Sequence, residues 1–489
     1  MGLDYAYYRN LLDEASAHIV GVGLTAFGRI SPALVTSNYE IVCYKWGSDL
    51  PFLGRFCPIR AVQRDFVPND LEKLNTQAIL RHPGILRYLE GLGKIAIFSY
   101  KHTGWVERFC EEHGWLLLNN PRVLRDQFES KDLFFRLVRK LKLPLILGEQ
   151  WDVRRLSDDK DYLELRKRVG ERLVFQLVSF SEGGGKGTYF INNLADFRTF
   201  LEDTHGRLDL SQRQLVNASK FIEGISGSIT GCVTRYGVLT GPVQTQVLDV
   251  PELVNLRERR GIWRGHDWSF KHYPQSVQDQ AERITRALGE AMALKGYKGI
   301  FGVDLMIDMK LGKVYPNEIN PRYTGAFPVY SFLQLGAGEI SFDMFQLLEF
   351  LDINYQMDFE AVDRSWKAPK EGAQLVLHNK DPERWAKAMG ELPAGVYRLK
   401  SKKSKVKSQK LSFERVRDGV TPLDIQHPDE FVLTDGVPKP GDLVKPHLRC
   451  GKLVFGRSIL DGTHNRLNEW ARTIVNEVYQ RLDLQPLDI

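Results

Sequence analysis

The stretch VYPNEINPRYTG, Val314–Gly325, decides the fold of this chain. It begins with apolar, strand-forming residues and then sets three polar side chains, Glu318, Asn320 and Arg322, on alternate positions, with Pro321 stiffening the run. Side chains two positions apart on an extended strand point to the same face. We therefore expect a carboxylate, an amide and a guanidinium to stand in one row.

The preceding stretch, GIFGVDLMIDM, is predicted to be the partner strand. Asp304 lies on the opposite face of this strand from its apolar side chains, which are Phe301, Val303, Leu305 and Ile307. Gly312 marks a turn between the two strands. Pairing through that turn places Asp304 opposite the Glu318 and Asn320 pair.

Two carboxylates and an amide oxygen make a hard oxygen site, which suits Mg²⁺ or Mn²⁺ completed by water and nucleotide phosphates. The planar fork of Arg322 suits a phosphoryl oxygen. The alternative is an exposed strand with alternating polar residues. It is disfavoured because Asn-Pro interrupts a sheet ladder and because two facing carboxylates repel each other without a cation.

A second candidate element is the glycine-rich run EGGGKG, Glu182–Gly187. Its glycines allow the backbone to approach an anion and to offer its N–H groups. A flexible hairpin tip has the same composition, so both readings stay open for this run taken alone. It is not a Walker A loop, because a strand-like TYFIN follows it instead of a helix.

The composition indicates a globular protein of two to four domains. The chain has 489 residues, 43% hydrophobic and 26% charged, and a net charge of only +6. That balance gives little support for a nucleic-acid partner. Five scattered cysteines without CxxC spacing predict reduced, buried thiols and a cytoplasmic location. The N-terminus lacks an apolar signal segment, and no run is long enough to predict a membrane span.

The first part of the chain has the rhythm of a parallel α/β sheet, in which short apolar strands alternate with helical segments. The stretch His18–Ile30 is predicted to be a short strand followed by a glycine turn, and further short strands are predicted at Glu40–Trp46, Lys94–Tyr100 and Trp115–Asn120. The glycines of GVGLTAFG, with Glu40 about 20 positions on, raise the alternative of a dinucleotide-binding loop. They fit that fingerprint poorly, so a plain strand-to-helix turn is favoured.

Further along, a helix is predicted over Glu129–Pro144 with an apolar stripe of Leu133, Phe134, Leu137 and Leu141. Two antiparallel strands are predicted to meet at a turn at Tyr236–Gly237. The cationic run 399–410 is expected to be a solvated hairpin tip or mobile loop, the alternative being a contact with an acidic partner. The C-terminal stretch His447–Leu482 is expected to form a strand, a turn and an amphipathic helix.

Taken together, these segments resemble the ATP-grasp superfamily over roughly residues 126–351. The motifs that carry the resemblance are SKDLFFRLVRKLKLP, LVFQLVSFSEGGGKGT, KFIEG, GYKGIFGVDLMID and EINPRYTG. The resemblance implies an α/β and α+β protein in three parts. They are a Rossmann-like parallel-sheet domain (1–125), an ATP-grasp domain (126–360) with a mobile lid (about 145–220), and a smaller C-terminal α+β domain (361–489).

The resemblance also implies roles for particular residues in binding ATP. Lys131 would contact phosphate and, with Arg322, assist catalysis, while Asp304, Glu318 and Asn320 would hold Mg²⁺. The remaining nucleotide contacts would come from the loop and the hinge: Gly183, Gly184, Gly185 and Gly187 over the phosphates, Phe221 and Ile222 beside adenine, and Glu223 toward the ribose.

This sequence departs from the superfamily pattern in two places. Gln176 stands where a phosphate-facing lysine is usual, and Lys186 in the glycine loop could compensate for its loss. Lys220 stands where the hinge often has a glutamate. Both departures concern the details of nucleotide contacts.

The implied reaction is the ATP-dependent joining of a carboxylate to an amine, such as an amino acid, through an acyl phosphate. A substrate carboxylate is expected to bind Arg260, Arg264 or His266, in the basic stretch 257–274, with a solvated basic loop as the alternative. Thr324 is expected to border the substrate. Two further alternatives are another ATP-grasp enzyme, a carboxylase or phosphotransferase, and a non-catalytic nucleotide-binding regulator. The expected partners are small molecules, with a possible homodimer and no nucleic acid or membrane.

Overall fold

The computed structural model describes residues 4–66, 75–178, 187–254, 261–270, 273–399, 412–462 and 466–487. Three predicted features lie outside these residues in whole or in part. The glycine-loop residues Gly183, Gly184, Gly185 and Lys186 are among them, as are Arg260 and nearly all of the cationic run 399–410.

The N-terminal region is a parallel sheet of five strands in the order β3-β2-β1-β4-β5. The strands are β1 His18–Gly23, β2 Tyr39–Cys43, β3 Ile59–Ala61, β4 Ile95–Phe98 and β5 Leu116–Leu117. Its helices are α1 Tyr5–Asp13, α2 Leu50–Leu53, α3 Val62–Asp65, α4 Thr76–Leu80, α5 Pro83–Glu90 and α6 Gly104–Glu112, with 3₁₀ turns η1 Phe27–Arg29 and η2 Ser31–Leu34. The predicted Rossmann-like arrangement is confirmed.

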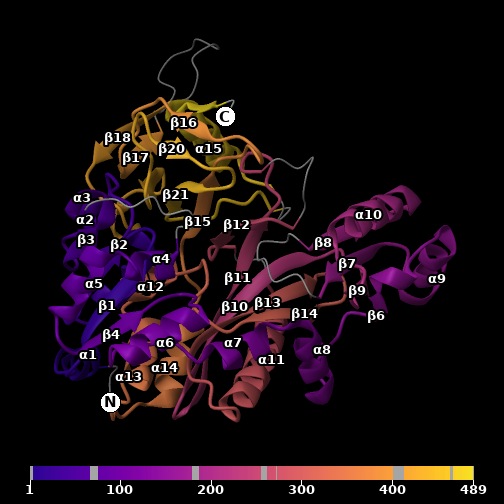
Figure 1. Ribbon diagram of the computed structural model, residues 1–489, viewed down its shortest axis with the longest axis horizontal. Coiled ribbons are helices and arrows are strands. Elements are labelled where there is room, and N and C mark those ends of the chain that lie inside the picture. The colour runs from indigo at the N-terminus through magenta and orange to yellow at the C-terminus, as the bar shows by residue number, and fades with distance from the viewer. Residues whose placement is uncertain are drawn as a thin grey trace.

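The segment predicted as the lid forms a separate antiparallel sheet that projects from the body of the molecule (Figure 1). Its strands, in the order β6-β9-β7-β8, are β6 Gly148–Asp152, β7 Leu173–Leu177, β8 Thr188–Ile191 and β9 Leu215–Lys220. Two helices, α9 Asp159–Val169 and α10 Leu194–Arg207, bury the apolar side of this sheet together with a short turn, η3 Val153–Arg155. These helices leave the other side of the sheet uncovered, and it carries polar side chains.

A ten-stranded sheet forms the centre of the molecule, in the order β14-β13-β10-β11-β12-β15-β21-β19-β17-β18. Its first five strands in chain order are β10 Ile225–Thr234, β11 Gly237–Leu248, β12 Trp263–Asp267, β13 Gly299–Asp308 and β14 Lys313–Asn320. The C-terminal strands are β15 Ala373–His378, β17 Gly395–Leu399, β18 Phe413–Arg417, β19 Glu430–Thr434 and β21 Arg449–Phe455. Because β15 pairs with β12, the C-terminal region extends the central sheet.

The two predicted hairpins are confirmed. β10 and β11 pair antiparallel across a turn at Tyr236, and β13 and β14 pair across Gly312, which has a positive φ of 62°. The predicted basic loop, in contrast, is wrong for Trp263–Asp267, which form strand β12 inside the sheet. Gly265, His266 and Asp267 have partners on both sides, so the tertiary pairing overrides the polar composition of this stretch.

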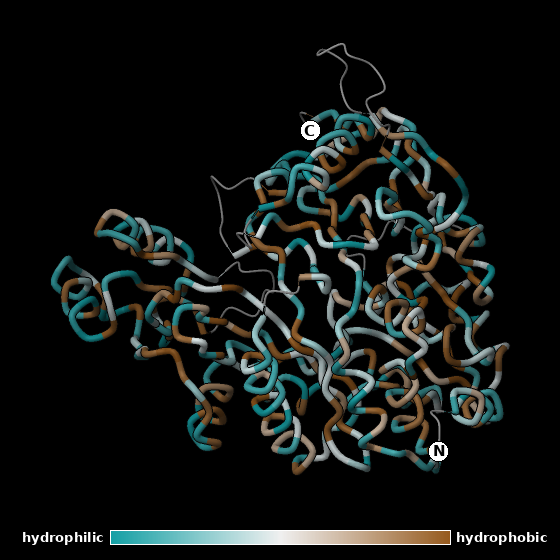
Figure 2. The backbone as a smooth tube through the Cα atoms, turned by 180° about the vertical axis from the view of Figure 1, so that it is seen from behind, coloured by the Kyte–Doolittle hydropathy of each residue, from teal (hydrophilic) through white to brown (hydrophobic). Residues whose placement is uncertain are grey.

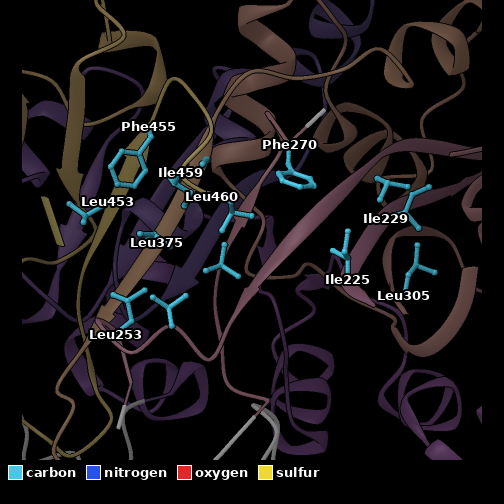
Figure 3. Packing of buried hydrophobic residues seen from close by; sticks show 14 of the residues in the cluster. Ile225, Ile229, Leu253, Phe270, Leu305, Leu375, Leu453, Phe455, Ile459 and Leu460 are labelled. Carbon is cyan, nitrogen blue, oxygen red and sulfur yellow. The ribbon is translucent and has the colours of Figure 1, made fainter. Parts of the chain in front are cut away.

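One face of the central sheet is apolar. Figure 3 shows Leu305, Ile229, Leu375, Leu453 and Phe455 on this face, contributed by strands far apart in the sequence. Helices α11 Gln275–Ala293 and α15 Glu469–Leu482 pack their buried residues into the same cluster. The opposite face carries polar side chains, and it is the face on which the candidate site lies.

The remaining elements support the junctions between these parts. They are α7 Arg122–Glu129, α8 Lys131–Lys140, α12 Val329–Gly336, α13 Phe342–Phe350, α14 Phe359–Trp366, η4 Pro422–Asp424, and the small sheet β20 Leu443–Val444, β16 Ala386–Ala388 and β22 Leu484–Pro486. In α8 the predicted stripe is partly wrong. Phe134 and Val138 are buried, whereas Leu133 is exposed, because the helix lies against β14 with a slightly different face.

The distribution of apolar residues agrees with these layers. In Figure 2 the apolar segments run through the body of the molecule, while the outer turns of the projecting lid are largely hydrophilic. All five cysteines are buried free thiols, as predicted. Within the part of the chain that the structure describes, every helix is too short or too polar to span a bilayer.

Candidate functional site

The hairpin of β13 and β14 brings the predicted metal row together. Asp304 on β13 pairs directly with Glu318 on β14, and Gly302 pairs with Asn320. A β-bulge between Asp304 and Leu305 adds one residue on β14 and sets this register. The row predicted from the sequence alternation is therefore present as a spatial cluster, which we call the metal row: Asp304, Glu318 and Asn320.

The electrostatics of the metal row favour a cation. Burial, followed by the nearby Glu318 carboxylate, raises the pKa of Asp304 well above its usual range. Ionisation of both neighbouring carboxylates is energetically costly unless a positive charge lies between them. The residues present thus fit a hard divalent cation.

The side-chain nitrogen of Asn320 points toward these carboxylates. Its Nδ2 lies 3.3 Å from Asp304 Oδ2 and 3.4 Å from Glu318 Oε1, while its Oδ1 accepts a hydrogen bond from Arg322 Nη2 at 2.9 Å. The NH₂ group thus supplies the partial positive charge in this arrangement. Asn320 can become an oxygen ligand only if its amide turns over and gives up the bond to Arg322.

A residue that the sequence reasoning missed supports the metal row from two strands away, across β10. Gln246 on β11 donates from Nε2 to Asp304 Oδ1 at 2.9 Å, and Ser226 on β10 donates to Gln246 Oε1 at 2.7 Å. The serine fixes which end of the amide faces Asp304. No local motif predicts the role of Gln246. Its partner, Asp304, lies 58 positions away, and only strand pairing brings the two side chains together.

We expect Gln246→Leu to weaken Mg²⁺ binding while leaving the fold nearly unchanged. Loss of the hydrogen bond lets Asp304 rotate, and the loss of one bond to a metal-ligating carboxylate typically weakens metal affinity by about 10- to 100-fold. The measurement is a Mg²⁺ titration of ADP release together with Mg²⁺-dependent thermal stabilisation. An unchanged half-saturating Mg²⁺ concentration in both assays would show that Gln246 does not position Asp304.

Arg322 joins the end of β14 to the end of α7. Its guanidinium lies 3.4 Å from Glu129 Oε1 and donates to the Tyr323 carbonyl at 3.2 Å. Glu129 is also bound by Lys101 at 2.9 Å. Among the described residues, the four hydrogen bonds of Arg322 go to Glu129, Tyr323 and Asn320, so one of its five N–H groups remains for a ligand.

Lys131 is the first residue of α8 and is half-buried near the metal row. Burial lowers the pKa of Lys131, and the Glu318 carboxylate acts in the opposite direction. This coupling shows that the lysine lies near Glu318. A cation from α8 and carboxylates from β13 and β14 therefore border one space.

The side of the lid sheet opposite α9 and α10 carries a row of polar side chains, which we call the lid row. Gln150, Asn217, Gln176 and Thr188 are paired in register across the four strands, so their side chains share that side. Gln150 Nε2 lies 3.2 Å from Asn217 Oδ1 and 3.5 Å from Asp132 Oδ1. The lid row therefore lies over the start of α8, beside Lys131, and Gln176 belongs to it. Gly187, at the described end of the glycine loop, accepts a hydrogen bond from Leu177.

The predicted hinge lies between the lid sheet and the central sheet. The Arg172 guanidinium stacks over the Phe221 ring at 3.9 Å. Glu223 forms exposed ion pairs at 3.1 Å with Arg172 and with Lys310 in the β13–β14 turn. Ile222, between them, is half-buried. The ion pairs of Glu223 thus link the hinge to the lid sheet and to the turn of the central sheet.

Among the predicted substrate residues that the structure describes, Arg264, His266 and Thr324 do not form one cluster. Arg264 is 9% exposed, and it donates hydrogen bonds to the carbonyls of Leu253 and Trp263. His266 lies on the polar face of the sheet, and burial lowers its pKa to about 3, so it is neutral at physiological pH. A neutral histidine cannot bind a carboxylate as a cation.

Another unpredicted residue, Gln374 on β15, connects His266 to the loop after the metal row. Its Nε2 lies 3.3 Å from His266 Nδ1 and donates to the Gly325 carbonyl at 2.7 Å. Thr324, just before that glycine, is half-buried, and its hydroxyl accepts a hydrogen bond from the backbone of Ala326. The polar face is therefore continuous from the metal row to His266.

Comparisons with known proteins agree with this geometry. A family profile described as an ATP-grasp domain matches residues 177–326. The carbamoyl phosphate synthase arginine-specific large chain of Halalkalibacterium halodurans is 22% identical over 224 residues, which are 45% of this chain and 19% of that protein. The match thus spans less than a fifth of the length of that relative.

Two solved structures share the fold over most of their length. The biotin carboxylase domain of the Hydrogenobacter thermophilus 2-oxoglutarate carboxylase has a TM-score of 0.55 at 14% identity, covering 90% of this chain and 86% of that one. The N5-carboxyaminoimidazole synthase of Aspergillus clavatus has a TM-score of 0.53 at 12% identity, covering 94% and 99%. Residues 177–326 are therefore an ATP-grasp domain, set in a chain that has the fold of these two structures.

Proposed function

We propose that this chain is an ATP-dependent enzyme that activates a carboxylate as an acyl phosphate and joins it to an amine. The observation that carries the proposal is the metal row, in which two carboxylates meet at the face covered by the lid. The structures with the same fold support it, because the Hydrogenobacter thermophilus domain was solved with MgADP and the Aspergillus clavatus enzyme with ADP.

Asp304, Glu318 and, after its amide turns over, Asn320 would hold Mg²⁺. When bound, the metal would neutralise charge on the nucleotide phosphates. Lys131 would bind phosphate oxygens from the α8 side, and the lid row with Gln176 would cover the nucleotide. The lid would also exclude water, which otherwise hydrolyses an acyl phosphate.

In the proposed reaction a carboxylate oxygen of the substrate takes the γ-phosphoryl group of ATP, and ADP leaves. Arg322 would donate to the phosphoryl oxygens as charge develops on them. The amine nitrogen then attacks the acyl carbon, phosphate leaves, and the nitrogen loses a proton. No protein nucleophile is required, and all five cysteines are buried.

A carboxylase-type reaction is the second candidate. The observation that favours it is that the Hydrogenobacter thermophilus domain was solved with bicarbonate. Bicarbonate would then take the place of the organic carboxylate. The two candidates share the metal row and differ only in the acid that is phosphorylated.

The test is ADP release from the full chain with ATP and Mg²⁺, followed by mass spectrometry of the products. We expect turnover with pooled carboxylic acids and amino acids to require both an acid and an amine, and to yield an amide. Turnover that requires bicarbonate and labels the product with ¹³C from bicarbonate would replace this proposal with the carboxylase reaction. Nucleotide binding without turnover under every pairing would contradict both.

A further inference from the structure

A cluster of cations lies where the carboxyl edge of the N-terminal sheet meets the C-terminal strands. Figure 1 shows β2 and its helices beneath β17, β18 and β21. Four residues, which we call the basic cluster, converge there from both sides: Arg29 and Lys45 from the loops after β1 and β2, and Arg449 and Lys452 from β21.

The basic cluster has more positive charge than its carboxylates balance. Asp435 is the shared partner, at 2.7 Å from Arg449 and 4.0 Å from Lys452. Arg29 donates hydrogen bonds to the backbone carbonyls of Val22 and Gly28. Among the described residues, neither Arg29 nor Lys45 has a carboxylate within 4.0 Å. Burying unbalanced cations is costly, so an additional anion would stabilise this arrangement.

The second carboxylate nearby does not remove the excess. Asp49 accepts hydrogen bonds from the backbone nitrogens of Asp435 and Gly436, at 3.0 and 3.2 Å, and so fixes the turn after β19. Lys45 also faces a third carboxylate, that of Asp442. Three carboxylates therefore surround four basic groups, and burial lowers the pKa of one of these groups, Lys452, to about 7. If the basic cluster served only to hold the N-terminal sheet against the C-terminal strands, we would expect its positive and negative charges to balance.

Unsatisfied polar atoms lie in the same place. Thr434 is fully buried, and its Oγ1 has no hydrogen-bond partner among the described residues. It pairs in register with Lys452, so both side chains lie on the same face of the sheet. The buried hydroxyl of Tyr100, over whose ring the Arg29 guanidinium lies at 4.1 Å, also has no partner in the described part of the chain. Two such hydroxyls beside excess cations match the donors that an oxyanion needs.

The basic cluster adjoins the candidate site. The ring of Tyr100 stacks on that of Tyr323 at 5.1 Å, and Tyr323 directly follows Arg322. Strand register also places Lys452 on the same face of the sheet as Gln374 and His266. A substrate anchored at the basic cluster would thus extend along the polar face toward the metal row.

We propose that Arg29, Lys45, Arg449 and Lys452 bind an acidic group, a carboxylate or a phosphate, at the end of the substrate remote from its reacting atoms. This inference rests on the proposed function, because it assigns a property to the substrate of that reaction. The substrate class is an acid or amine that carries a second, anionic group. Arg449 is 35% exposed in its side chain and marks the side from which the group would enter.

The test measures binding without turnover. The full chain, saturated with MgADP, is titrated calorimetrically with inorganic phosphate and, separately, with succinate. We expect saturable binding of at least one probe, weakened about tenfold or more in Lys452→Met and in Arg29→Met, since each removes one charge-assisted contact. Arg472→Met, which makes the same charge change on the exposed surface of α15, should bind like the wild type.

Both variants are expected to fold, because methionine keeps the apolar stem and removes an unbalanced buried charge. Their melting temperatures without anion report this directly. Preference for phosphate would indicate a phosphorylated substrate and preference for succinate a carboxylated one, and either supports the proposal. Failure of both probes to bind, or equal binding by Lys452→Met and the wild type, would overturn it. Since ADP release is not measured, these outcomes do not depend on whether the proposed reaction occurs.

Discussion

Glu318→Gln should abolish most of the ADP release while raising the stability of the metal-free protein. The substitution keeps the size of the side chain and removes one of the two carboxylates of the metal row. Loss of a charged ligand at the transferring phosphoryl group is expected to lower kcat by about a thousand-fold. In EDTA, however, Asp304 no longer faces a like charge, so the melting temperature should rise above that of the wild type.

The pH dependence of stability gives a second readout of the same variant. The pKa of Asp304 is raised by burial and by Glu318, so the folded protein holds its proton at a pH where the unfolded chain has lost it. Without metal, the free energy of unfolding of the wild type should therefore fall as pH rises from about 4 toward neutrality. In Glu318→Gln this fall should be smaller, and Mg²⁺ should no longer stabilise the protein.

The control is Glu290→Gln, the same chemical change on the exposed surface of α11. It should leave ADP release, the effect of Mg²⁺ and the pH profile as in the wild type. ADP release by Glu318→Gln within a few-fold of the wild type would show that the metal row does not carry the reaction, whatever its effect on stability.

Arg322→Ala should lower kcat by about 100- to 1,000-fold with a much smaller change in the KM for ATP. Arg322 lies beside Asn320 and is proposed to donate to the phosphoryl group when charge develops on it. Removal of one such donor typically costs about this much in kcat, because the interaction strengthens in the transition state. Steady-state ADP release at saturating Mg²⁺ separates kcat from KM.

Arg322 also forms an ion pair with Glu129, so its structural role needs a matched control. Glu129→Gln removes that ion pair and leaves the guanidinium in place. If Arg322 acts on the phosphoryl group, Glu129→Gln should lose far less activity than Arg322→Ala. Equal losses in the two variants would mean that Arg322 only holds β14 against α7.

The sequence alone determined the local features of this protein. Alternation of polar and apolar residues predicted the β13–β14 hairpin, the shared face of Glu318 and Asn320, and the position of Asp304 opposite them. The turn at Gly312 was predictable because glycine adopts a positive φ at little cost. These features depend on residues close together in the chain, where spacing alone fixes which side chains share a face.

The tertiary structure decided what depends on pairing between distant segments. The basic composition of Arg264 and His266 suggested an exposed anion site, but β12 became an inner strand, and burial leaves His266 neutral. Gln246 and Gln374 carry no motif, since their partners lie 58 and 108 positions away. The basic cluster likewise exists only because β21 meets the edge of the N-terminal sheet. Sequence periodicity fixes the face of a strand, whereas its neighbours follow from the burial of the whole sheet.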